Sequence, residues 1–255
     1  MLRENAALVS MCDYSLGRLL DTMDELDMWK DTMLIVNNDH GFLLGEHGWF
    51  GKNVPPWYSE TAQNPLFIWD PRSGRAGERC GQLVQNIDLV PTLFEFFSLP
   101  IPADVQGRSL TGAIARDEQV REAALFGLHG GHLNCTDGRY VLMRAPVNPD
   151  EEFYNYGLMP VHLSKLFTLP ELHSAELSEP FTFTKGCKLL KTRALAPAHS
   201  SMQHTMGDFL FDLETDPRQQ TPLENAEIME YMLGHTRRLL EESDAPAEVY
   251  TRYGV

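Results

Sequence analysis

The stretch DTMLIVNNDHGFLLGEHGWFGKN, residues 31–53, joins a short apolar run to a dense group of polar side chains. The run TMLIV is apolar on consecutive positions and contains β-branched residues, which predicts a strand buried on both faces. Asp39 and His40 follow directly, and Gly41 allows the chain to turn sharply after them. Because ligands bind beyond the carboxyl ends of parallel strands, we expect this turn to line a binding crevice.

The flanking segments extend this unit into an α/β fold. From Glu4 to Asp27, apolar residues recur every three or four positions, which predicts an amphipathic helix. We expect residues 32–38 to form an interior parallel strand and NPLFIWDP, residues 64–71, to form a second buried strand. NIDLVPTLFEFFSLP, residues 86–100, begins a helix whose proline lies near the first turn.

The pattern changes after residue 115. The segments ALFGL, GRYVLMRAP and GDFLFDLETDP are typical of separate strands joined by loops that contain proline and glycine. They predict a smaller α+β subdomain with an antiparallel sheet over residues 116–255, closed by a surface helix from Glu224 to Ser243. Residues 1–115 then form the α/β part of the chain.

Composition excludes several classes of protein. Thirty-six acidic residues against 21 basic ones give a formal charge of −15, which disfavours nucleic acid as a partner. No segment approaches the ~20 apolar residues of a membrane span. The N-terminus lacks a basic segment followed by an apolar one, so no signal peptide is visible, and the location is cytoplasmic if Met1 is the true start. The four cysteines are far apart and are expected to be free thiols, mostly buried.

The polar group after the strand has the chemistry of an anion site with a metal. The carboxylate of Asp39 is a hard ligand suited to Ca²⁺, Mg²⁺ or Mn²⁺, and the imidazole of His40 also admits Zn²⁺. Lys52 lies 13 positions after Asp39, between Gly51 and Asn53, and its ammonium can neutralise a tetrahedral oxyanion. A metal and an ammonium together suit sulfate or phosphate esters. The alternative is that Asp39 merely caps a turn.

Residues 31–53 resemble the sulfatase stretch in which a strand ends in Asp-His-Gly or Asp-Asn-Gly and continues through Gly-Glu-His-Gly to Gly-Lys. Further segments resemble the same family in the same order: NPLFIWDPRSG, QNIDLVPTLFEFFSLPIPADVQGRSL, TDGRYVLMR and FLFDLETDPRQQTPL. The resemblance covers essentially the whole chain. It implies an alkaline-phosphatase-like sandwich and hydrolysis of sulfate esters, of a small molecule or a glycan, at one divalent cation.

The resemblance assigns roles to individual residues. Asp39 and His40 match two metal ligands, and Lys52 matches the lysine that contacts the sulfate. Calcium is the expected ion, although His40 stands where many members have asparagine, so Mn²⁺, Mg²⁺ and Zn²⁺ stay open. His47, beside Glu46, is expected to orient the loop by hydrogen bonds. The remaining pair, His129 and His132, is expected to face substrate, with a strand-to-loop transition as the alternative.

The sulfatase nucleophile is missing from this chain. Sulfatases carry it in a Cys/Ser-x-Pro/Ala-x-Arg motif of the N-terminal half, where it becomes formylglycine, and two further metal-binding aspartates also come from that half. The nearest string, CTDGR from Cys135 to Arg139, has Asp137 in place of Pro or Ala. We therefore expect a C-terminal portion that is inactive alone, exposes apolar surface, and either pairs with an N-terminal half or self-associates.

Two alternatives stay open. Phosphonate monoester and phosphodiester hydrolases of the same superfamily share the Asp-His pair and a lysine at this spacing. A chain without a nucleophile is also compatible with a non-catalytic binding module.

Overall fold

The computed structural model describes residues 2–52, 56–159, 161–162, 165–194 and 200–255. By internal packing the chain forms two compact units. The first comprises Met1–Gln82 with Thr111–Gln119, and the second comprises Leu83–Leu110 with Val120–Val255. The boundary predicted between residues 115 and 116 refers to parts of the expected sulfatase fold and not to these packing units. It stays a prediction.

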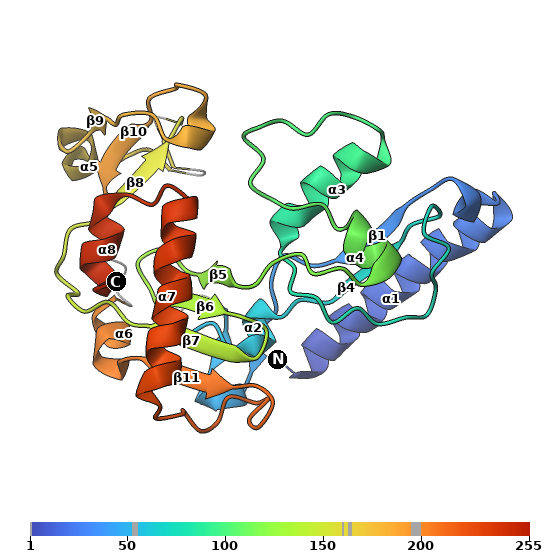
Figure 1. The fold of residues 1–255 in the computed structure, drawn as a ribbon, viewed down its shortest axis with the longest axis horizontal. Helices are drawn as coiled ribbons and strands as arrows, with labels where there is room; N and C mark the ends of the chain where they lie inside the picture. The colour runs from blue at the N-terminus through green and yellow to red at the C-terminus, as the bar shows by residue number, and fades with distance from the viewer. Residues whose placement is uncertain (1, 53–55, 160, 163–164, 195–199) are drawn as a thin grey trace. The chain divides into compact units, whose positions relative to one another are not determined.

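The first unit begins with helix α1, Leu2–Glu25, which confirms the predicted helix (Figure 1). Its apolar face is largely exposed: Met23 is the buried residue of the helix, whereas Leu8 and Leu19 are 57% and 48% exposed. The four-residue and three-residue spacing therefore predicts the helix correctly, but the described chain leaves that face mostly uncovered.

After the short 3-10 turn η1, Met28–Lys30, strand β1 runs over Leu34–Asn37. It pairs antiparallel with β4, Leu66–Trp69, with Leu34 opposite Trp69. The prediction of an interior parallel strand is therefore wrong in direction, and among the described residues these strands form a two-stranded sheet. The cause is connectivity: a parallel pair needs a crossover back to the starting end of the first strand, and the described residues between 38 and 65 contain none.

The segment between these strands forms a compact loop. Strand β2, Leu43–Leu44, pairs antiparallel with β3, Phe50–Gly51, around the 3-10 turn η2, Glu46–Gly48. A single-turn helix, α2, Ser59–Ala62, then leads into β4. Leu43 is fully buried, so this loop has an apolar anchor of its own.

An ion pair fixes the chain after β4. Asp70 is buried, and its two carboxylate oxygens accept hydrogen bonds from Nε and Nη2 of Arg72 at 3.0 and 2.6 Å. Burial opposes the charge of Asp70, but the bonds from Arg72 prevail and lower the pKa of that carboxyl. Ser73 Oγ donates to the Asp70 carbonyl at 2.9 Å, and helix α4, Thr111–Arg116, completes this unit.

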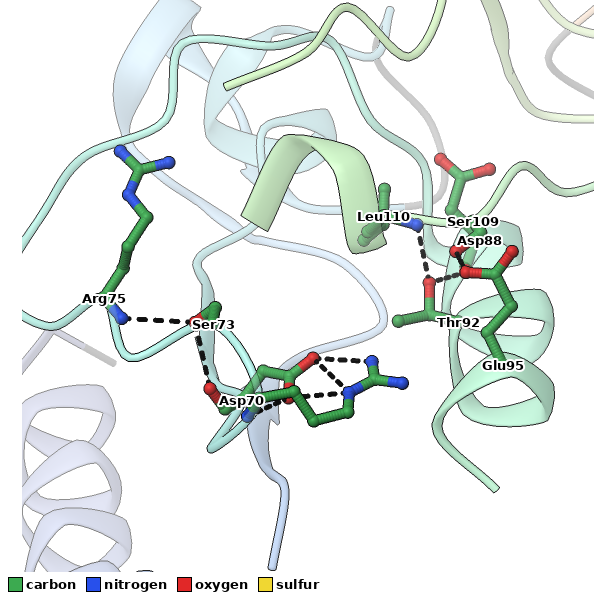
Figure 2. Close-up of polar contacts among 9 residues, drawn as sticks. Asp70, Ser73, Arg75, Asp88, Thr92, Glu95, Ser109 and Leu110 are labelled. Atoms are coloured by element: carbon green, nitrogen blue, oxygen red, sulfur yellow. Dashed lines mark hydrogen bonds and ion pairs between the residues drawn. The ribbon is translucent and has the colours of Figure 1, made fainter. Parts of the chain in front are cut away.

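In the second unit, Asp88 organises the start of helix α3, Leu89–Phe96, which confirms the helix predicted there. Asp88 ends the turn η3, Asn86–Asp88, is fully buried, and accepts from Arg121 Nη2 at 2.5 Å. Its carbonyl accepts from Thr92 Oγ1 at 2.6 Å, and Thr92 Oγ1 in turn accepts from the backbone N–H of Leu110 at 2.9 Å (Figure 2).

The predicted antiparallel sheet is confirmed in the second unit. Its strand order is β11-β7-β6-β5, and all neighbouring strands are antiparallel. The strands are Phe209–Asp212 for β11, Tyr140–Arg144 for β7, Leu133–Thr136 for β6 and Ala124–Gly127 for β5. Helix α7, Ala226–Glu242, lies along this sheet and confirms the predicted closing helix (Figure 1). Cys135, Leu142, Leu210 and Met232 form the buried core between them.

A second small sheet completes this unit. Its order is β8-β10-β9, with β8 at Tyr154–Gly157, β10 at Leu190–Arg193 and β9 at Glu176–Leu177. The remaining elements are α5, Leu169–His173, η4, Thr182–Thr184, α6, Ser200–Met206, and α8, Ala247–Tyr253.

Two expectations from composition can be compared with the fold. Among the described residues, no helix is long and apolar enough to span a membrane. The four cysteines are free thiols as expected, but only Cys135 is buried, because the other three lie on exposed segments instead of core strands.

Candidate functional site

The turn after β1 is held in place by backbone bonds to α2. The N–H of Gly41 donates to the carbonyl of Thr61 at 2.8 Å, and the N–H of Phe42 donates to the carbonyl of Glu60 at 3.1 Å. A Cβ atom on residue 41 would lie 1.8 Å from the Glu60 carbonyl oxygen, so only glycine fits. Gly41 therefore lets the chain turn and also lets the backbone of α2 come close to the turn.

His40 is oriented by its own turn. Its Nδ1 lies 2.9 Å from the carbonyl oxygen of Gly41. Because a carbonyl only accepts, Nδ1 carries a proton, and in the neutral ring Nε2 keeps its lone pair. The ammonium of Lys52 contacts that Nε2 and can donate to it. With Nδ1 donating to a backbone carbonyl and Nε2 unprotonated, His40 has the tautomer that metal-binding histidines usually have, and Lys52 contacts that Nε2.

Asp39 completes this group. Its Oδ2 lies 3.4 Å from Nε2 of His40, and its side chain is 85% exposed. The Asp39 carbonyl accepts from Nδ2 of Asn64 at 3.1 Å, which holds the turn from the other side. Asp39, His40 and Lys52 therefore meet at one place, as the sequence predicts. This grouping is a fact of geometry, whereas the role of each residue stays a prediction.

The donor set at this place fits part of a metal site. It offers one exposed carboxylate and one unprotonated imidazole nitrogen, which the Lys52 ammonium contacts, and a divalent cation such as Mn²⁺ accepts both types of ligand. The described residues contain no group of three or more His, Cys, Asp or Glu side chains that could hold a metal. Two ligands alone leave most of the coordination of such an ion to water or to other groups.

Two buried oxygens near the turn have no hydrogen-bond partner among the described residues. They are Oδ1 of Asn64 and Oγ1 of Thr61, and each belongs to a residue that already bonds the turn through another atom. Buried polar atoms are normally satisfied. The surroundings of Asp39 therefore have acceptor capacity that contacts within the described chain do not use.

The Gly-Glu-His-Gly loop lies against α2. Oε2 of Glu46 accepts from the N–H of Leu44 at 2.6 Å, and this bond lowers the pKa of the Glu46 carboxyl. The His47 ring stacks on Tyr58 with centroids 3.6 Å apart and planes 7° apart. Nε2 of His47 lies 3.4 Å from Oε2 of Glu60. His47 thus contacts two residues outside its own loop, and its role in orienting the loop stays a prediction.

The histidines of the second unit have different surroundings. His132 is 2% exposed, and its Nε2 donates to the carbonyl of Gly207 at 2.9 Å, because a carbonyl can only accept. Burial lowers the pKa of His132. His129 is exposed as a whole residue, but its ring packs edge-on against Phe153, and partial desolvation together with the nearby charge of Arg252 lowers its pKa. A substrate-facing role for either stays a prediction.

Sequence reasoning missed two residues that hold the turn and the loop together. Glu60 and Asn64 contact the site through a carboxylate and an amide. Their positions carry no periodic or ligand-like spacing relative to Asp39. Only their position in the sequence could have indicated this role: they lie between Lys52 and β4, in the segment that connects the loop back to the sheet.

Comparisons with known proteins show which sequences and folds this chain is similar to. Residues 45–130 match the family model described as "N-sulphoglucosamine sulphohydrolase, C-terminal". The chain is 36% identical over 129 residues to an N-acetylglucosamine-6-O-sulfatase of Bacteroides thetaiotaomicron, covering 49% of this chain and 23% of that protein. It is 31% identical over 173 residues to an arylsulfatase of Clostridium perfringens, covering 64% of this chain and 35% of that protein.

A solved structure shows the fold. The structure of BT4656 in complex with its substrate D-glucosamine-2-N,6-O-disulfate aligns with a TM-score of 0.62 at 19% identity. The alignment covers 92% of this chain and 40% of that chain. The fold is thus that of the alkaline-phosphatase-like sulfatases. The chain is thus similar to sulfatases, and the family model that residues 45–130 match describes the C-terminal part of such a protein. The chain spans 23% and 35% of the length of the two relatives above.

Proposed function

We propose that this chain forms the C-terminal part of a sulfatase that hydrolyses sulfate esters with a divalent cation. Asp39 and His40 would hold the cation, and Lys52 would contact the sulfate. The observation that carries the proposal is the orientation of His40: its Nδ1 is occupied by the Gly41 carbonyl, while Nε2 faces Lys52 and Asp39. A turn cap would need the Asp39 carboxylate but would not need an imidazole lone pair beside an ammonium.

The residues of this chain would act on the charge of the sulfate group. The ammonium of Lys52 would stabilise negative charge that develops on the sulfuryl oxygens. Asp39 offers a carboxylate oxygen, and His40 offers Nε2, which carries no proton because Nδ1 donates to the Gly41 carbonyl. A bound cation would supply further charge neutralisation as a Lewis acid. The nucleophile, a formylglycine in this family, would come from sequence outside these 255 residues.

The proposed substrates are sulfated small molecules or glycans, and the sulfated glucosamine bound in the solved relative supports this class. Isothermal titration of the 255-residue chain with Mn²⁺ and with Ca²⁺ tests the cation site. We expect weak binding that is lost in Asp39→Ala and in His40→Ala and is kept in Asp31→Ala, a change of an exposed carboxylate before β1. Equal binding in all three variants contradicts the proposal.

Activity needs a second assay. The chain alone should not hydrolyse an aryl sulfate, because groups that act on one transition state lose nearly all their effect without the nucleophile. Co-expression with an N-terminal sulfatase portion that carries formylglycine should restore turnover. An aryl phosphonate monoester, assayed in parallel, distinguishes the phosphonate hydrolase alternative. Turnover by the isolated chain that survives Asp39→Ala would refute the proposed site.

A further inference from the structure

One residue, Glu60, contacts both halves of the candidate site. Its backbone carbonyl accepts from the N–H of Phe42 at 3.1 Å, directly after the turn that carries Asp39 and His40. The same carbonyl oxygen occupies the space beside Gly41. Its carboxylate Oε2 lies 3.4 Å from Nε2 of His47, in the loop that leads to Lys52. The main chain of Glu60 therefore holds the turn, and its side chain reaches the loop.

The loop needs an external contact at this point because His47 has an unfavourable backbone conformation. Its φ is 54° and its ψ is 17°, a left-handed conformation that few residues other than glycine adopt. Such a conformation persists only when the surroundings stabilise it. Two contacts do so at His47, the stack on the buried Tyr58 ring and the approach to the Glu60 carboxylate. Both partners come from the start of α2, so α2 supports the loop as well as the turn.

The negative charge of Glu60 affects the neighbouring side chains Tyr58 and His47. Burial is the main cause of the raised pKa of Tyr58, and the negative charge of Glu60 raises it further. The side chain of His47 is 11% exposed and that of Glu60 is 30% exposed, so solvent screens this pair only partly. Loss of the carboxylate would leave the His47 ring nitrogen largely desolvated and without this acceptor.

We propose that Glu60 is a positioning residue that couples the Asp39–Gly41 turn to the His47 loop and thereby sets Lys52 beside His40. The inference rests on the proposed function, since it takes Asp39 and His40 as cation ligands. Residues that orient metal ligands typically change metal affinity by about 10–100-fold when they are replaced. Glu60 acts here through its neighbours and contacts neither the cation nor the substrate.

The test uses the 255-residue chain, its Glu60→Ala and Glu60→Gln variants, and Glu25→Ala as an exposed control at the end of α1. Mn²⁺ affinity should fall about 10–100-fold in Glu60→Ala. It should recover in large part in Glu60→Gln, because the amide oxygen can still accept from Nε2 of His47. Glu25→Ala should bind like the unmodified chain. Unchanged affinity in Glu60→Ala would overturn the proposal.

Two further measurements separate coupling from general damage to the fold. In ring ¹⁵N spectra the His47 proton should lie on Nε2 in the unmodified chain and lose that preference in Glu60→Ala. His47→Ala should weaken Mn²⁺ binding as much as Glu60→Ala does, and the double variant should be no weaker than either one. Additive losses would mean that the two residues act independently, which contradicts the coupling.

The His47 spectra test the role of Glu60 independently of the proposed cation site. If the unmodified chain binds no Mn²⁺, the cation proposal fails, while the His47 spectra and amide exchange at Gly41 and Phe42 still test Glu60. Faster exchange at both amides together with altered His47 signals in Glu60→Ala supports the coupling. Unchanged exchange and unchanged signals refute it.

Discussion

The carbonyl oxygen of Glu60 lies 1.8 Å from the position that a Cβ atom on Gly41 would take. No side chain fits there unless α2 moves away from the turn. Because the obstructing atom belongs to the main chain, Gly41→Ala should displace α2 and destabilise the first unit by about 1–3 kcal/mol, the usual cost of overpacking. Urea unfolding followed by tryptophan fluorescence measures this change.

Gly17→Ala is the matched control for that substitution. A Cβ at residue 17 meets no atom within 4 Å, and the residue lies inside α1. Alanine in an exposed helix interior is more favourable than glycine by about 0.5–1 kcal/mol. Equal effects of Gly17→Ala and Gly41→Ala would show that close packing against Glu60 is not what requires glycine at the turn.

The exposed apolar face of α1 predicts self-association of the isolated chain. Leu8 and Leu19 lie on this face and are largely exposed, and contiguous apolar surface of this kind favours association. Leu8→Glu combined with Leu19→Glu should shift the chain toward monomer in sedimentation velocity, without loss of helix content, because glutamate is a good helix former.

Leu166→Glu combined with Leu177→Glu controls for the added negative charge, since both residues are exposed outside α1. This second pair should leave the association unchanged. A monomeric unmodified chain that binds no hydrophobic dye would contradict the prediction.

Local pattern predicted the elements of the fold better than their partners. Apolar spacing located α1 and α7, and short β-rich segments located the antiparallel sheet of the second unit. The direction of β1 relative to its neighbour could not be predicted from local pattern. An apolar run indicates that a strand is buried but not which strand pairs with it. Pairing with β4 depends on the path of the 28 residues numbered 38–65, which contain no regular repeat.

The candidate site shows the same division. Asp39, His40 and Lys52 were found because their residue types and spacing have chemical meaning. Glu60 was not found, because its main contact with the turn is made by a carbonyl that every residue has. The orientation of His40 was equally inaccessible, since it depends on a bond from Nδ1 to the carbonyl of Gly41. Backbone contacts of this kind become visible only in three dimensions.

His132 predicts a dependence of stability on pH. Burial holds its pKa below the ordinary value of about 6.5, so the unfolded chain binds a proton more readily than the folded one. Stability is therefore fully present above that ordinary value and falls as pH decreases below it. The urea midpoint should be lower at pH 5.5 than at pH 7.5, and this difference should shrink in His132→Gln, whose amide can still donate to Gly207.

His129 also has a lowered pKa and contributes with the same sign. His129→Gln should remove a further part of the difference between the two pH values. Carboxylates such as Asp70, whose pKa is lowered, lose their contribution only at more acidic pH and do not act in this window. A midpoint that is equal at both pH values in the unmodified chain would contradict the assignment of both rings.

His40→Asn should change which cation the site prefers. The imidazole of His40 presents Nε2, a ligand that suits Mn²⁺ and Zn²⁺, whereas an amide oxygen suits Ca²⁺. Titration of the variant should show Ca²⁺ affinity rising relative to that of Zn²⁺, while Asp39→Asn should weaken both. A variant that keeps the Zn²⁺ preference of the unmodified chain would show that His40 does not contact the cation.

Lys52 gives the most direct test of the anion site. Its ammonium contacts Nε2 of His40, and that same Nε2 lies 3.4 Å from Oδ2 of Asp39. In a sulfatase completed by an N-terminal formylglycine portion, Lys52→Ala should lower the rate on an aryl sulfate by about 10²–10³-fold, the usual effect of removing one charge-stabilising group. Lys30→Ala, which removes an exposed lysine paired with Asp27, should leave the rate unchanged. If both variants kept the full rate, Lys52 would not stabilise the transition state; if only the rate on an aryl phosphonate fell, the site would belong to a phosphonate hydrolase.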